Sequence, residues 1–127
     1  MKKLLILLFS LLISSISFAS WTLIGSDVNQ NQYYIDFVKV KKVDRYHYFW
    51  WMTDLLEPDN EGDLSYLVYF KTDCKLLRSM TLIEYYYTQS MGTGNLTTNN
   101  VQNPEWLFHP PESMNENMIE EVCEYVK

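Results

Sequence analysis

The stretch that decides the fold runs from Tyr46 to Leu55 and reads YHYFWWMTDL. In an extended strand, successive side chains point to opposite faces, so these residues separate into two sets. Both sets contain large apolar side chains, and each face of the strand therefore needs a cover of its own. One set is Tyr46, Tyr48, Trp50 and Met52, and the other is His47, Phe49, Trp51 and Thr53.

Other segments rich in β-branched and aromatic residues flank this strand, and short polar turns separate them. Parallel strands need long crossover connections, so short turns predict an antiparallel meander. We expect one sheet of about five to six strands. The flanking segments are Trp21 to Gly25, Tyr33 to Val38, Leu64 to Lys71 and Leu76 to Thr88, with a charged turn at Lys39 to Arg45 and a loop at Glu57 to Asp63.

The C-terminal segment changes from strand to helical periodicity. Pro110-Pro111 would stop any earlier helix, and Ser113 followed by Glu116 is a capping-box pattern. Apolar residues then recur at helical spacing. We therefore expect an α+β fold with a C-terminal helix packed on one face of the antiparallel sheet. The apolar helix residues are Ile119, Val122, Cys123 and Val126.

Residues 1–19 have the pattern of a secretory signal peptide: Lys2 and Lys3, a short apolar run, and small residues ending at Ala19. The remaining segment, 20–127, is long enough for one domain. It loses two of the ten cationic residues and none of the sixteen acids, so its side-chain charge is about −8. Such an acidic domain argues against binding nucleic acid or anionic membranes. The apolar run is too short to span a bilayer comfortably, and no Cys follows Ala19 to carry a lipid anchor.

Cys74 and Cys123 are the two cysteines of the chain, and they are 49 positions apart. In an exported protein they predict one structural disulfide. Because Cys123 lies on the apolar stripe of the predicted helix and Cys74 at a strand corner, this bond would join the helix to the sheet. A metal pair or a reactive thiol is the alternative reading, but two distant cysteines without a nearby His make a poor zinc site.

No set of residues indicates an enzyme or a cofactor. His47 and His109 are the only histidines, and no Ser or Cys stands in a nucleophile motif beside them. Gly92-Thr93-Gly94 lacks the rest of a phosphate-loop pattern and reads as a flexible loop. The acidic stretch Asp54 to Asp63 lacks calcium-loop spacing, so a solvated hairpin loop explains it better than a metal or carboxylate catalytic site. For both histidines a packing or surface position is the favoured interpretation, and a ligand role is the alternative.

Aromatic residues make up 16% of the chain, and this is its unusual feature. Burial accounts for one side of each strand. The other side could present tyrosine and tryptophan to a protein partner, since these residues dominate binding hot spots. A tyrosine-rich sheet that is covered on both sides would explain the same composition. The candidate partner-binding residues are Trp50, Trp51, Tyr85, Tyr86 and Tyr87.

Several short motifs together resemble the surface-adhesin protein E family of small exported Gram-negative proteins. They cover nearly all of the chain after residue 19. The motifs are Trp21, Tyr33-Tyr34-Ile35-Asp36, Phe49-Trp50-Trp51-Met52-Thr53-Asp54, Asp73-Cys74 with Arg78, Trp106, Pro110 and Val122-Cys123.

The resemblance implies a non-enzymatic domain that adheres to host extracellular or plasma proteins. Two departures stand against a full transfer: the lipid-carrying Cys of the namesake adhesins is absent, and Pro111-Glu112 precedes Ser113 where a Pro-Gly-Ser-like turn is expected. A periplasmic structural or accessory envelope protein is therefore the alternative. The sequence predicts neither the ligand nor the oligomeric state, and no binding residue is transferred from the family.

Overall fold

The structure is a computed structural model that describes residues 20–127. The predicted signal peptide, 1–19, lies outside the described residues. Within them the chain forms eight strands, two single 3-10 turns, η1 (Phe37–Lys39) and η2 (Ser90–Gly92), and one α-helix, α2 (Met114–Tyr125). The strands are β1 (Trp21–Ser26), β2 (Gln32–Asp36), β3 (Lys41–Val43), β4 (Tyr46–Asp54), β5 (Ser65–Asp73), β6 (Arg78–Gln89), β7 (Thr93–Asn100) and β8 (Leu107–Phe108).

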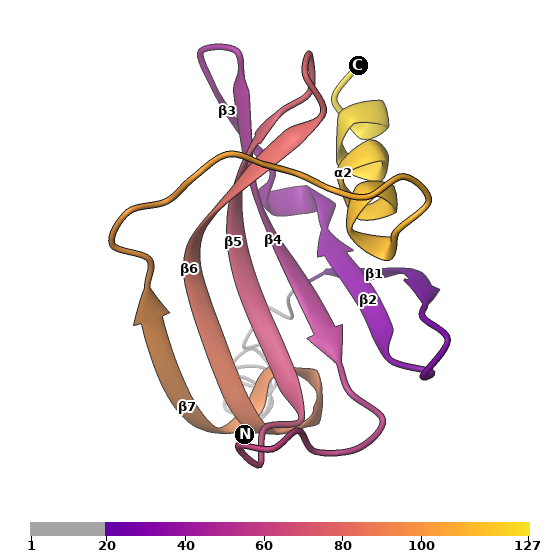
Figure 1. The fold of residues 1–127 in the computed structure, drawn as a ribbon, viewed down its shortest axis with the longest axis vertical. Helices are drawn as coiled ribbons and strands as arrows, with labels where there is room; N and C mark the ends of the chain where they lie inside the picture. Colours follow the sequence, from indigo (N-terminus) through magenta and orange to yellow (C-terminus); the bar gives the residue numbers. More distant parts are fainter. Residues whose placement is uncertain (1–19) are drawn as a thin grey trace, which may run out of the picture.

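All strand pairs are antiparallel, and six strands follow one another in the order β1-β2-β4-β5-β6-β7 (Figure 1). The meander and the α+β class are confirmed. The predicted number of about five to six strands is wrong, because the sheet has eight. Three strands are additional: β3, β7 and β8. Two of them are short: β3 pairs with the start of β4, inside the predicted charged turn, and β8 pairs with the start of β6.

The core lies between the sheet and α2, and β4 supplies its centre. Phe49 and Trp51 point to the helix side and are 0% and 6% exposed. Phe70 of β5 contacts both, with ring centroids 5.6 Å from Phe49 and 4.2 Å from Trp51. The helix closes this cluster with Met118, Ile119 and Val122. In the alternation predicted for Tyr46 to Leu55, the set that contains Phe49 and Trp51 is therefore the one that forms the core.

The helix begins where its sequence pattern predicts. Ser113 is the N-cap, and its Oγ accepts a hydrogen bond from the Glu116 N–H at 3.1 Å. The reciprocal half of a capping box is missing, because the Glu116 carboxylate accepts from the Glu112 N–H instead. The predicted disulfide is confirmed: Cys74 is bonded to Cys123, with the two Cα atoms 5.5 Å apart.

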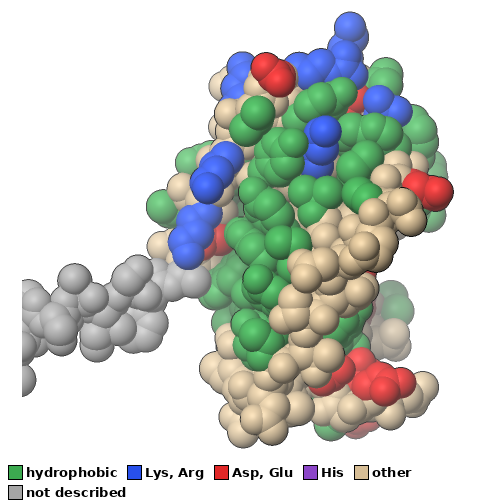
Figure 2. All heavy atoms as spheres, turned by 90° about the vertical axis from the view of Figure 1, so that its left-hand side faces the viewer, with side chains coloured by type: hydrophobic (Ala, Val, Ile, Leu, Met, Phe, Trp, Pro, Cys, Tyr) green, Lys and Arg blue, Asp and Glu red, His purple; other side chains and the backbone are tan. Residues whose placement is uncertain are grey.

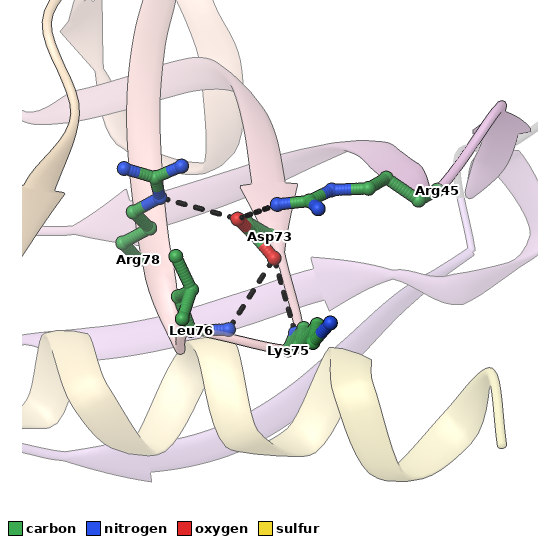
Figure 3. A network of polar contacts seen from close by, with 5 residues as sticks. All are labelled: Arg45, Asp73, Lys75, Leu76 and Arg78. Carbon is green, nitrogen blue, oxygen red and sulfur yellow. Dashed lines mark hydrogen bonds and ion pairs between the residues drawn. The ribbon is translucent and has the colours of Figure 1, made fainter.

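The corner that carries Cys74 is organised by the preceding residue, Asp73 (Figure 3). This carboxylate is 1% exposed, and its Oδ2 accepts from Arg45 at 2.8 Å and from Arg78 at 3.2 Å. Its Oδ1 accepts from the backbone N–H groups of Lys75 and Leu76. Burial alone would raise the pKa of Asp73, but these hydrogen bonds hold the pKa below its ordinary value. The charged Asp73 side chain therefore orders the turn that contains Cys74, one of the two disulfide-bonded cysteines.

The sequence does not predict strand β7, and it indicates a loop at the first residues of this strand. The expectation for Gly92-Thr93-Gly94 is wrong at Thr93 and Gly94, which begin the strand. The backbone reaches β7 through a turn with positive φ at Met91 and Gly92. Gly94 also has positive φ, and a Cβ there would lie 2.6 Å from Thr88 Oγ1, so only glycine fits. Every β7 residue is exposed, and the strand therefore lacks the apolar alternation that marks the others.

Candidate functional site

The side of the sheet opposite α2, which we call the open face, is covered by no helix of residues 20–127 (Figure 1). The strand register brings side chains from three central strands together on this face. Figure 2 shows a continuous band of hydrophobic side chains, with Lys and Arg side chains on one side and uncharged polar surface on the other. The open-face residues of the central strands are Tyr48, Trp50, Met52, Leu67, Tyr69, Tyr85 and Tyr87.

Four rings on this face form a contiguous row, the aromatic ladder: Tyr48, Tyr69, Trp50 and Tyr85. Trp50 is at its centre, stacked on Tyr69 at 4.7 Å and on Tyr85 at 5.2 Å between ring centroids. Tyr48 extends the row at 6.0 Å from Tyr69. Cross-strand contacts of this kind hold the rings in place before any partner arrives. All four side chains are half-buried, so part of each ring remains accessible.

The open face is closed at one end by the chain itself. Met52 is fully buried, although its neighbours on the same face are not. The turn η2 packs there: a Cβ on Gly92 would lie 3.0 Å from Leu67 Cδ1 and 3.9 Å from Met52 Sδ. The accessible part of the open face therefore lies around Trp50 and does not extend along the full length of β4.

Two hollows flank Trp50. The first, which we call the Asp36 hollow, has a volume of about 280 Å³, and the second has about 290 Å³. Both include Trp50 and the exposed Lys39, so they adjoin along the same residue pair. The Asp36 hollow is lined by Trp21, Asp36, Lys39, Trp50, Leu67, Tyr85 and Tyr87, and the second by Val38, Lys39, Val40, Lys41, Trp50 and Tyr69.

The five predicted partner-binding aromatics divide between the two faces. Trp50, Tyr85 and Tyr87 meet at the Asp36 hollow. Trp51 is buried beneath α2, and it is therefore excluded from a surface site while the helix is in place. Tyr86 pairs with Tyr66 on the helix side, where burial and the acceptor Glu84 raise its pKa to about 12. The alternation of strand side chains separates each of these residues from its neighbour in sequence.

Sequence reasoning missed several residues of this face, among them Tyr48, Tyr69, Trp21 and Asp36. Tyr69 fits the side-chain alternation of its own strand, but only the β4–β5 register places Tyr69 beside Trp50. Burial, followed by the neighbouring Tyr48, raises the pKa of Tyr69. Trp21 and Asp36 are paired across the β1–β2 hairpin. Only the register of this hairpin could have predicted that the two residues are neighbours.

The two histidines occupy separate structural positions. His47 lies beside the disulfide, with Nδ1 3.9 Å from Cys74 Sγ, and burial with nearby Lys42 lowers its pKa. His109 Nε2 is 2.6 Å from Ser79 Oγ, and burial lowers its pKa although Glu116 opposes this. Within the described part of the chain, no three His, Cys, Asp or Glu side chains are grouped to hold a metal ion.

The acidic loop is tied into the fold through its carboxylates. Asp59 accepts hydrogen bonds from the Tyr66 hydroxyl and from the N–H groups of Glu61 and Asp63. The Tyr66 bond is the main reason why the pKa of Asp59 is lowered. Asp54 accepts from the Met91 N–H at 2.8 Å, which fastens η2. These contacts give Asp54 and Asp59 a structural role.

These features define a small α+β domain with one sheet face covered by a disulfide-linked helix and the other presenting aromatic side chains. Across residues 20–127, no helix has the length and apolar character needed to cross a membrane. The profile of the surface-adhesin protein E family matches residues 21–124, and the chain belongs to that family. Surface adhesins are binding proteins rather than enzymes.

The solved structures of Haemophilus influenzae protein E have the same fold. One, in crystal form II, has a TM-score of 0.66 at 18% identity, with 87% of this chain and 92% of that chain covered. A second has a TM-score of 0.63 at 18% identity, covering 84% and 86%. At this identity the likeness concerns the fold. No curated protein matches the sequence.

Proposed function

We propose that this chain is an exported, non-enzymatic binding domain whose open face contacts a protein partner. The observation that carries this proposal is the aromatic ladder, whose rings are held in a row by stacking and remain partly exposed. Aromatic side chains supply much contact area at little cost in conformational entropy, as protein-binding hot spots do. Membership of an adhesin family favours a host extracellular or plasma protein as the partner.

Binding is best tested with the full chain, expressed and purified after export, against a panel of extracellular-matrix and plasma proteins. We expect Trp50→Ser and Tyr85→Ser to reduce binding at least tenfold while the thermal unfolding transition remains cooperative. A matched control is Phe108→Ser, because Phe108 is an exposed aromatic residue of β8 outside the ladder. If Trp50→Ser and Tyr85→Ser bind the partner as strongly as the control Phe108→Ser does, the open face is not the binding site.

Location decides between adhesion and an envelope role. We expect an adhesin to be degraded by protease added to intact cells, since its partner lies outside the cell. If the protein resists protease until the outer membrane is opened by osmotic shock, host adhesion is excluded. The periplasmic accessory role then becomes the proposed function, with an envelope protein as the partner of the same face.

A further inference from the structure

The Asp36 hollow contains a charged group that the fold does not use. Asp36 is 1% exposed, and its Oδ1 is buried without a hydrogen-bond partner among the described residues. Burying a carboxylate oxygen unpaired is costly, and such atoms are rare in native proteins. One explanation for such an atom is a bound group that completes its hydrogen bonding.

The structural roles open to Asp36 are not taken by its side chain. Asp36 is the N-cap residue of η1, but its side chain makes no capping hydrogen bond. The ion pairs of residues 20–127 are Arg45–Asp73, Arg78–Asp73 and Lys127–Glu124, so Asp36 has no cationic partner. Lys39 lines the same hollow and is exposed, yet it forms no ion pair with this carboxylate.

The walls of the hollow are suited to a cation. Trp21, Trp50, Tyr85 and Tyr87 line the same hollow as Asp36, and the faces of aromatic rings attract positive charge. The same domain uses this contact elsewhere: Lys71 Nζ lies 4.3 Å from the Tyr46 ring centroid, and the Arg78 guanidinium lies 4.4 Å from the Trp106 centroid. A carboxylate within aromatic walls favours a cation over a neutral or anionic group of equal size.

The size of the hollow limits the ligand. Its volume of about 280 Å³ is slightly below the roughly 300–1,000 Å³ of clefts that hold drug-sized ligands or cofactors. It is large enough for several waters, or for the end of one long side chain. The hollow also adjoins the aromatic ladder through Trp50 and Tyr85, so a side chain entering it would project from a partner already lying on the open face.

We propose that the Asp36 hollow takes a cationic side chain, lysine or arginine, of a partner protein, with Asp36 pairing the charge and Trp21 and Trp50 contacting its aliphatic stem. This inference rests on the proposed function for the identity of the partner, and on the hollow itself for the chemistry. The shared recognition element is a positively charged nitrogen group on a flexible apolar stem.

The probes are Nα-acetyl-lysine methylamide and Nα-acetyl-arginine methylamide, which distinguish ammonium from guanidinium, and the neutral Nα,Nε-diacetyl-lysine methylamide. Binding is followed by NMR through the indole N–H signals of the four tryptophans. We expect saturable shifts at Trp21 and Trp50 with a cationic probe, in the millimolar range, and none at the buried Trp51. The neutral probe should bind about tenfold more weakly or not at all.

The decisive variant is Asp36→Asn, which keeps the shape and removes the charge. We expect it to weaken binding of the cationic probe about tenfold or more, whereas Asp44→Asn should leave it unchanged, because Asp44 is an exposed acid away from the hollow. Thermal unfolding of each variant shows that the fold is retained. If Asp36→Asn fails to fold, Trp21→Leu replaces it, with the same loss expected.

Three results would overturn the inference: no saturable shift with either cation, equal binding of the neutral probe, or undiminished binding by the folded Asp36→Asn or Trp21→Leu variant. A partner protein that binds the open face without competition from the probes would contradict this inference alone. Probe binding without any protein partner would support the hollow and contradict only the proposed function.

Discussion

Trp50 and Trp51 are neighbours in sequence, yet their surroundings differ completely. Trp51 contacts Phe70 in the core beneath α2, whereas Trp50 stacks between Tyr69 and Tyr85 on the open face. The chemistry of the two side chains is identical, so the difference in their roles comes from strand geometry alone. At the residue scale, Trp51 therefore contributes to stability, and its neighbour Trp50 is available for surface contact.

The two tryptophans should respond differently to truncation. We expect Trp51→Ala to lower the free energy of unfolding by about 3–5 kcal/mol, because it leaves a cavity in the core. Trp50→Ala should cost only about 1–2 kcal/mol, mainly from lost stacking. Urea unfolding followed by circular dichroism measures both. Similar losses for the two variants would contradict the assignment of faces.

Asp73 should make stability depend on acid pH. Its pKa is lowered from 3.8, so the stabilisation by its charged form is complete above that pH and is lost as the pH falls through the folded-state value. We expect Asp73→Asn to reduce the free energy of unfolding by about 2 kcal/mol near neutral pH. The difference from the wild type should shrink steadily below pH 3.8 in urea titrations. Asp44→Asn is the control, and a constant difference across this range would contradict the role of the charge.

At the scale of elements, the sequence predicted those whose apolar residues repeat regularly. The alternation from Tyr46 to Leu55 and the helical spacing after Ser113 both identify a buried face, and both elements are present. Strand β7 could not be found this way, because its eight exposed residues have no apolar face. It exists through backbone pairing with β6, and this pairing leaves no periodic pattern in the sequence.

The candidate site shows the same limit. The aromatic composition indicates Trp50, Tyr85 and Tyr87, but it indicates Trp51 and Tyr86 equally. Side-chain alternation separates neighbouring residues without showing which side of the strand stays open. Tyr69, Trp21 and Asp36 require the pairing registers of β1 with β2 and of β4 with β5. A register follows from turn geometry and packing rather than from any one segment. The Asp36 hollow is therefore a property of the assembled sheet.

The N-cap of α2 can be tested as an element. Ser113→Ala removes the acceptor of the Glu116 N–H and should lower the free energy of unfolding by about 1 kcal/mol. Ser113→Asn should restore most of this loss, since asparagine caps equally well. Ser90→Ala, at an exposed position in η2, serves as the control. Chemical denaturation resolves these differences, and an unchanged Ser113→Ala variant would show that tertiary contacts alone hold the helix end.

For the whole molecule, the two faces of the sheet divide the work. The helix side holds the core and the disulfide, and the open side holds the aromatic ladder and the Asp36 hollow. The helix and the sheet pack together through the core, and the disulfide joins them covalently at the corner of Asp73 and Cys74. This separation means that stability and binding should be altered independently by changes on opposite sides of one sheet.

Removing the disulfide tests that separation directly. The bond closes a loop of 49 residues between the sheet and α2, so the double variant Cys74→Ala, Cys123→Ala should lose roughly 4 kcal/mol of unfolding free energy. Because no residue of the aromatic ladder belongs to that clamp, the folded variant should still bind the cationic probes with unchanged affinity at low temperature. Urea unfolding gives the first quantity, and the indole signals of Trp21 and Trp50 give the second. An unchanged stability would show that packing alone holds the helix on the sheet. Loss of probe binding in the folded variant would instead show that the helix side shapes the open face through the strands that both share.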